Sequence, residues 1–89
     1  MPQDTAAEKL KMEQMGRWLD AVCEELDVDP AVIDRDRDLL LDLIATVAHG
    51  PSRPGAPMTA FVIGYAAAGS GRPVSEVAAR VERLAGDWD

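Results

Sequence analysis

Residues 58–69 read Met-Thr-Ala-Phe-Val-Ile-Gly-Tyr-Ala-Ala-Ala-Gly and contain no charged side chain. The length of this run and its lack of period-two alternation indicate a helix rather than a strand. A helix that is apolar on every side is typical of the centre of a helical bundle. The stretch therefore predicts an all-α fold in which this helix is buried by the others, with Phe61 in the core.

The segments on either side predict where this helix begins and ends. Residues 50–57 read Gly-Pro-Ser-Arg-Pro-Gly-Ala-Pro, and three prolines with two glycines exclude a helix or a central strand there. After the apolar run, Gly69-Ser70-Gly71 ends the helix and Pro73 favours the start of the next one. The spacing of the valines that follow predicts a final helix over residues 73–86.

Two further helices are predicted over residues 12–27 and 37–49, where apolar residues recur at the spacing of one helical face. Between them, Asp29-Pro30 predicts a helix start and a short helical turn over residues 30–34. Residues 1–11 have little to bury and predict a flexible N-terminal arm, which leaves residues 12–89 as a single helical domain. We thus expect a small bundle of four main helices plus one short helical turn. Its expected core comprises Trp18, Leu19, Val22, Leu40, Ile44, Phe61 and Val81.

Composition and charge exclude several classes of function. The chain has 89 residues and a net charge of −7, which disfavours nucleic acid and anionic membrane surfaces as partners. No apolar run is long enough to span a bilayer, and the N-terminus lacks the apolar core of a secretory signal. Cys23 is the only cysteine, which excludes an intrachain disulfide and fits a reducing cytoplasm. A chain this short has a thin core, which favours a homodimer or a heterologous partner.

The residues suited to catalysis are few. There is one His, one Cys and one Tyr, and no Gly-rich phosphate loop, metal motif or nucleophile elbow is present. The alternating carboxylates of residues 34–38 lack the glycine and the closing glutamate of an EF-hand loop, and we interpret them as a solvated run. Cys23 lies on the apolar face of the first helix, where a thiol packs as a small hydrophobe. We therefore expect no metal or cofactor and a binding role rather than catalysis.

One interval, residues 43–75, contains no Asp or Glu although the chain is acidic on both sides of it. Amides at a helix N-terminus attract anions, so the loop before the apolar helix is a candidate anion site. An arginine clamp, one imidazole donor and two hydroxyls would complete it; these are Arg53, His49, Ser52 and Thr59. The alternative is structural, with Arg53 capping the carbonyl end of the preceding helix and His49 paired with the backbone. Both interpretations are open at the level of sequence.

Short motifs along residues 15–88 carry a family resemblance. They are Trp18-Leu19, Ala48-His49-Gly50, Arg53-Pro54-x-Ala56-Pro57, Phe61-x-x-Gly64 and Gly71-Arg72-Pro73. Through these motifs the chain resembles a small uncharacterised bacterial helical domain family. Members of that family are found beside or fused to molybdenum cofactor guanylyltransferase, which joins GMP to molybdopterin.

The resemblance implies a role by association. It implies an accessory or partner-docking domain in molybdopterin-guanine dinucleotide biosynthesis, with the guanylyltransferase or another protein of that pathway as partner. The chain lacks the nucleotide-binding βαβ unit of such a transferase, so we do not expect it to be the enzyme itself. The alternative function is a stand-alone binder of a small anion, such as a nucleotide or pterin phosphate, through the His49–Arg53 loop.

Overall fold

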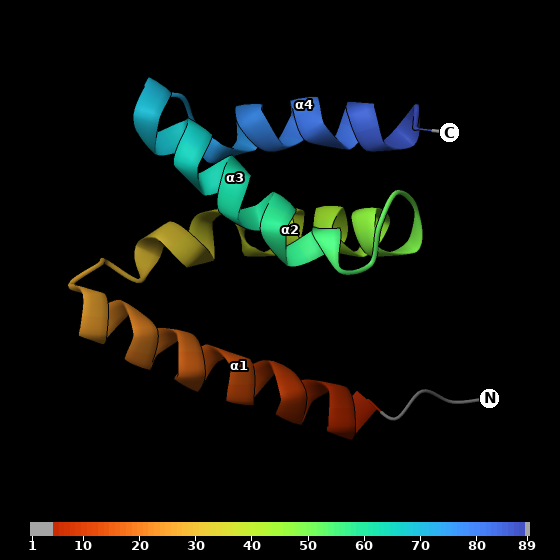
Figure 1. Ribbon diagram of the computed structural model, residues 1–89. Coiled ribbons are helices and arrows are strands. Elements are labelled where there is room, and N and C mark those ends of the chain that lie inside the picture. Colours follow the sequence, from red (N-terminus) through yellow and green to blue (C-terminus); the bar gives the residue numbers. More distant parts are fainter. Residues whose placement is uncertain (1–4, 89) are drawn as a thin grey trace. The chain divides into compact units, whose positions relative to one another are not determined.

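A computed structural model describes residues 5–88, and every regular element in that range is a helix (Figure 1). The helices are α1 (Thr5–Leu26), α2 (Ala31–His49), α3 (Gly55–Ser70) and α4 (Val74–Gly86). The predicted all-α fold with four main helices is confirmed. The chain divides into two compact units, Met1–Arg35 and Asp36–Asp89. The first unit holds α1 and the first turn of α2, and the second holds the rest of α2 with α3 and α4. The single domain expected over residues 12–89 stays a prediction.

Helix α1 begins at Thr5, well before the expected start near residue 12. Residues 6–11 read Ala-Ala-Glu-Lys-Leu-Lys, all of them strong helix formers that extend a helix without needing a buried face. Residues 5–11 of the predicted arm are therefore helical, and residues 1–4 lie outside the described part of the chain. Farther along α1, Cys23 is a free and buried thiol, as predicted.

The end of α1 is closed by a residue in the left-handed region. Asp27 follows the helix with a φ of 57°. Its N–H donates to the Glu24 carbonyl at 3.3 Å, and the next amide, that of Val28, donates to the Cys23 carbonyl at 2.8 Å. These two bonds form the Schellman arrangement, which satisfies carbonyls that the helix leaves without partners.

Helix α2 starts where the sequence predicts and then runs without a break. The Ala31 N–H donates to Asp29 Oδ1 at 3.0 Å, so Asp29 caps the helix as expected. The short turn expected over residues 30–34 and the helix expected over 37–49 form one element, which corrects the prediction of a separate turn. Residues 34–38 read Asp-Arg-Asp-Arg-Asp and contain no glycine or proline that would interrupt a helix.

Helix α3 starts earlier than expected, because residues 55–57 of the predicted connector are helical. Pro57 is the third residue of the helix, where the amide of any residue would lack a partner within the helix, so a missing N–H costs little. At the other end Gly71 adopts a φ of 72° and donates its N–H to the Ala67 carbonyl at 3.0 Å. The following helix, α4, matches the predicted range closely.

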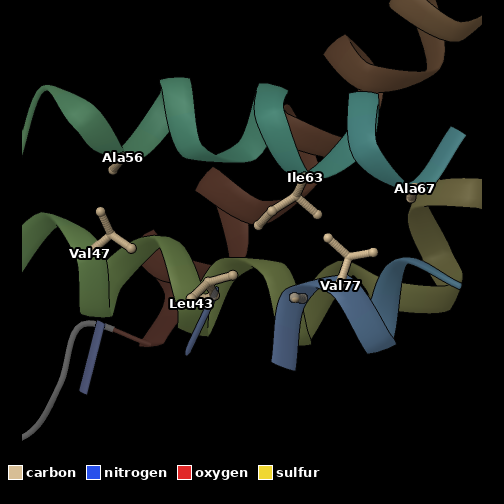
Figure 2. Packing of buried hydrophobic residues seen from close by; sticks show 7 residues of the cluster. Leu43, Val47, Ala56, Ile63, Ala67 and Val77 are labelled. Carbon is tan, nitrogen blue, oxygen red and sulfur yellow. The ribbon is translucent and has the colours of Figure 1, made fainter. Parts of the chain in front are cut away.

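The core of the second unit lies where α2, α3 and α4 meet (Figure 2). Leu43 of α2 and Ile63 of α3 are its largest fully buried side chains, with 0% and 1% of their surface exposed. In Figure 2 Ile63 points from α3 toward Leu43 and Val77. Burial of each such side chain stabilises the fold by about 1.5–3 kcal/mol. The remaining buried members are small or medium in size: Val47, Ala56, Ala67, Val77 and Ala78.

Two members of the expected core are exposed. Trp18 and Phe61 have 67% and 66% of their surface exposed, so their predicted burial is wrong. Helix α3 turns Ala56, Ile63 and Ala67 toward the core. Phe61 lies on the opposite side, so the prediction that this helix is buried all round is also wrong. A unit of three helices covers only one side of each. The other expected core residues are partly buried: Leu19, Val22, Leu40, Ile44 and Val81.

Candidate functional site

The four residues of the candidate anion site lie at the connection between α2 and α3. His49 is the last residue of α2, Ser52 and Arg53 lie in the loop, and Thr59 lies in α3. His49 Nδ1 is 2.7 Å from the Ala45 carbonyl oxygen. A carbonyl only accepts, so Nδ1 carries the proton and donates it to the backbone. This is the backbone pairing that the structural alternative predicts for His49.

The amides at the start of α3 already have partners within the chain. The Gly55 N–H donates to Ser52 Oγ at 3.1 Å, and the Ala56 N–H donates to the Arg53 carbonyl at 3.2 Å. Pro57 has no N–H, and from the next residue the helix's own hydrogen-bond ladder begins. The donors that make other helix N-termini attractive to anions are therefore used by the chain itself.

The surface beside this loop is apolar. A hollow of about 150 Å³ opens there, lined by Val47, Pro51, Thr59, Val81, Leu84, Ala85 and Trp88. The Thr59 hydroxyl donates to the Gly55 carbonyl at 2.8 Å. Arg53 is exposed, and within residues 5–88 its side chain makes no ion pair or hydrogen bond. Of the four candidate residues, Arg53 is the one whose side chain has no hydrogen-bond partner within residues 5–88, and it does not cap α2.

A second surface, which we call the outer face of α3, was not expected from the sequence. It consists of Met58, Phe61, Val62 and Tyr65, whose spacing of three, four and seven residues places them on one side of the helix. Each is between 59% and 73% exposed. The Phe61 and Tyr65 rings are in contact, with centroids 6.0 Å apart and planes tilted by 41°. The sequence does not distinguish this side of the helix from the side of Ala56, Ile63 and Ala67, because both are apolar.

Beside the large side chains of the outer face, the helix has a residue without a side chain. Gly64 lies beside Phe61 and Tyr65, and a Cβ built on it would meet nothing within 4 Å. Because Gly64 has no side chain, another chain could approach the helix closely there. The α3 sequence has no charged residue. A large aromatic side chain offers about 150–250 Å² for burial. The four side chains of the outer face, each partly covered by its neighbours, together present roughly 400 Å² of apolar surface.

A family model described as a domain of unknown function, DUF6457, matches residues 10–89. The chain belongs to this family. No curated protein and no solved structure matches it. The DUF6457 match includes the larger part of α1 and all of α2, α3 and α4. The loop and the outer face of α3 therefore both belong to the DUF6457 domain.

The described residues of this DUF6457 domain contain no group of three or more His, Cys, Asp or Glu side chains that could hold a metal ion. Within the same residues, no helix combines the length and apolar composition needed to cross a lipid bilayer. The outer face of α3 and the loop before it are the surfaces considered as candidate sites on the second unit.

Proposed function

We propose that this DUF6457 domain is a non-catalytic docking domain that binds a protein partner through the outer face of α3. The observation that carries the proposal is the set of four large apolar side chains exposed on an uncharged helix. Contiguous apolar patches of more than a few hundred Å² on soluble proteins mark interaction sites. Aromatic residues such as Phe61 and Tyr65 also suit the centre of an interface, where a few side chains supply most of the binding energy.

The proposed partner is molybdenum cofactor guanylyltransferase or another protein of that pathway. The resemblance supports this choice, and one of its motifs, Phe61-x-x-Gly64, lies on the outer face and its border. A docking role also agrees with the positions of two reactive side chains. The His49 ring is hydrogen-bonded to the Ala45 carbonyl, and the Cys23 thiol is buried. A free thiol fits the cytoplasm, where we place the complex.

The test is binding of the purified domain to the purified guanylyltransferase of the same organism, measured by calorimetry. Phe61→Ser and Tyr65→Ser should each weaken binding by roughly 30-fold, as expected for a central aromatic side chain. Val32→Ser is the control, because Val32 is an exposed apolar residue that lies on α2 and outside the outer face. It should leave the affinity unchanged, and circular dichroism should show equal helix content for all variants.

Two results would contradict the proposal. The first is no binding at about 100 µM, a concentration at which even weak interfaces are occupied. The second is an equal loss of affinity in Val32→Ser and Phe61→Ser, which would remove the outer face of α3 from the interface.

The second candidate function is binding of a small anion at the His49–Arg53 loop. It is supported by the side chain of Arg53, which forms no ion pair within residues 5–88 and lies in an interval without Asp or Glu. Calorimetric titration with phosphate and GMP tests it, with Arg53→Ala as the paired variant. Binding that disappears in Arg53→Ala supports this function, whereas no heat of binding in the wild type at about 5 mM ligand rejects it.

A further inference from the structure

Helix α1 carries an exposed strip that the docking face does not use. The strip consists of Lys11, Gln14, Trp18, Ala21 and Glu25, and all five are exposed. Successive members are three or four residues apart, so they follow one line along the helix. We call this line the α1 strip.

The charges of the α1 strip are arranged evenly about Trp18. Lys11 precedes Trp18 by seven residues and Glu25 follows it by seven. With a rise of 1.5 Å per residue, each charge lies roughly 10 Å from the tryptophan along the helix, and two turns place all three on the same side. Within residues 5–88 neither Lys11 nor Glu25 makes an ion pair. The strip therefore has a positive end, an aromatic centre and a negative end.

We propose that the α1 strip binds the α1 strip of a second copy of this chain, with the two helices antiparallel. A two-fold axis through Trp18 then places Lys11 of each copy opposite Glu25 of the other. The tryptophans meet in the middle, beside a hollow of about 330 Å³ that is lined by Trp18, Ala21, Val22, Glu25 and Leu26. Two-fold contacts of this kind require one patch that is complementary to itself, and the α1 strip meets that requirement.

The arrangement selects both the partner and the orientation. A parallel pair would place Lys11 against Lys11 and Glu25 against Glu25, which repel. Two chains of net charge −7 also repel each other at long range, so a self-contact needs local attraction of this kind. A single pair of helices buries less area than a standard interface, and the dimer should dissociate in the micromolar range.

Charge exchange tests this contact by analytical ultracentrifugation. Lys11→Glu places two carboxylates opposite each other at both ends of the contact, and Glu25→Lys places two ammonium groups there. Each variant alone should dimerise roughly 10- to 100-fold more weakly than the wild type. An equimolar mixture of the two should form a heterodimer of about wild-type affinity, because opposite charges meet again at both ends. Misfolding of either variant could not produce that recovery.

Two further variants complete the experiment. Trp18→Ala should abolish dimerisation, and Phe61→Ser should leave it unchanged, since Phe61 lies on α3. The second result separates this contact from docking at the outer face of α3. A wild type that stays monomeric at about 500 µM would overturn the proposal, because micromolar dimers are fully formed at that concentration. Single variants that dimerise like the wild type would also overturn the proposal. An equimolar mixture of the two charge variants that remains monomeric would do the same.

Discussion

Asp27 is the residue whose replacement should stabilise α1 most. Among residues 5–88 it is the only non-glycine residue with a positive φ, 57°, and the two hydrogen bonds that end the helix hold it there. A Cβ in the left-handed region crowds the backbone at a cost of about 1–2 kcal/mol, which is smaller for Asp because its side chain can bond locally. The last turn of α1 has no basic residue, so the carboxylate also meets the negative end of the helix dipole, at about 0.3–1 kcal/mol.

Asp27→Gly removes the crowding and the charge together. Glycine loses more backbone entropy on folding, which costs about 0.5–1 kcal/mol and offsets part of the gain. We therefore expect the free energy of unfolding of the α1 unit to rise by about 1 kcal/mol. Asp27→Asn removes only the charge and keeps a side chain that tolerates this region, so its gain should be about 0.3–0.5 kcal/mol.

Urea unfolding followed by circular dichroism measures the change, and hydrogen exchange of the Val28 amide measures it locally. Val28 donates to the Cys23 carbonyl in the closing motif, so a gain of about 1 kcal/mol should slow its exchange roughly fivefold in Asp27→Gly. If Asp27→Gly is no more stable than Asp27→Asn, relief of crowding at Cβ does not exceed the entropy cost of glycine, and the expected gain of about 1 kcal/mol is refuted.

Other substitutions test the packing. Leu43→Ala should lower the free energy of unfolding by about 2–5 kcal/mol in thermal denaturation, because Leu43 is fully buried, whereas Leu41→Ala on the exposed side of α2 should cost less than about 1 kcal/mol. Gly64→Ala should raise stability by about 0.5–1 kcal/mol yet weaken docking, since a methyl group there meets nothing in this chain; unchanged affinity would mean that no partner approaches Gly64. Cys23→Ser should cost about 1–3 kcal/mol by placing a hydroxyl in a buried position, and rapid labelling of native Cys23 by a bulky thiol reagent would argue against its burial.

Local signals account for what the sequence predicts well. Asp29 caps α2 and Gly71 closes α3 in the left-handed region, and both effects depend only on residues nearby in the chain. The prediction of a separate turn before residue 37 was wrong, because it relied on the composition of the stretch and not on residues that break a helix. Residues 34–38 are dense in charge, but charge does not interrupt a helix when glycine and proline are absent, so α2 is continuous.

The outer face of α3 could not be predicted in the same way, because burial depends on how many neighbours a helix has. An apolar run has no polar side to show which direction faces water. In the structure, small residues such as Ala56 and Ala67 share the core with Ile63, whereas Phe61 and Tyr65 face away. A large apolar residue can thus be excluded from a core whose helices meet through small side chains.

The stability of the fold explains the residues of the loop before α3 but not those of the outer face. Ser52 accepts from the first amide of α3, Ala56 is buried in the core, and Pro57 suits the first turn. Stability alone accounts for these residues, and no ligand is needed to explain them. Phe61 is exposed and Gly64 weakens the middle of a helix, so stability explains neither. Binding at the outer face of α3 explains both, because Phe61 supplies area and Gly64 permits close approach, and this is why we favour protein docking over anion binding.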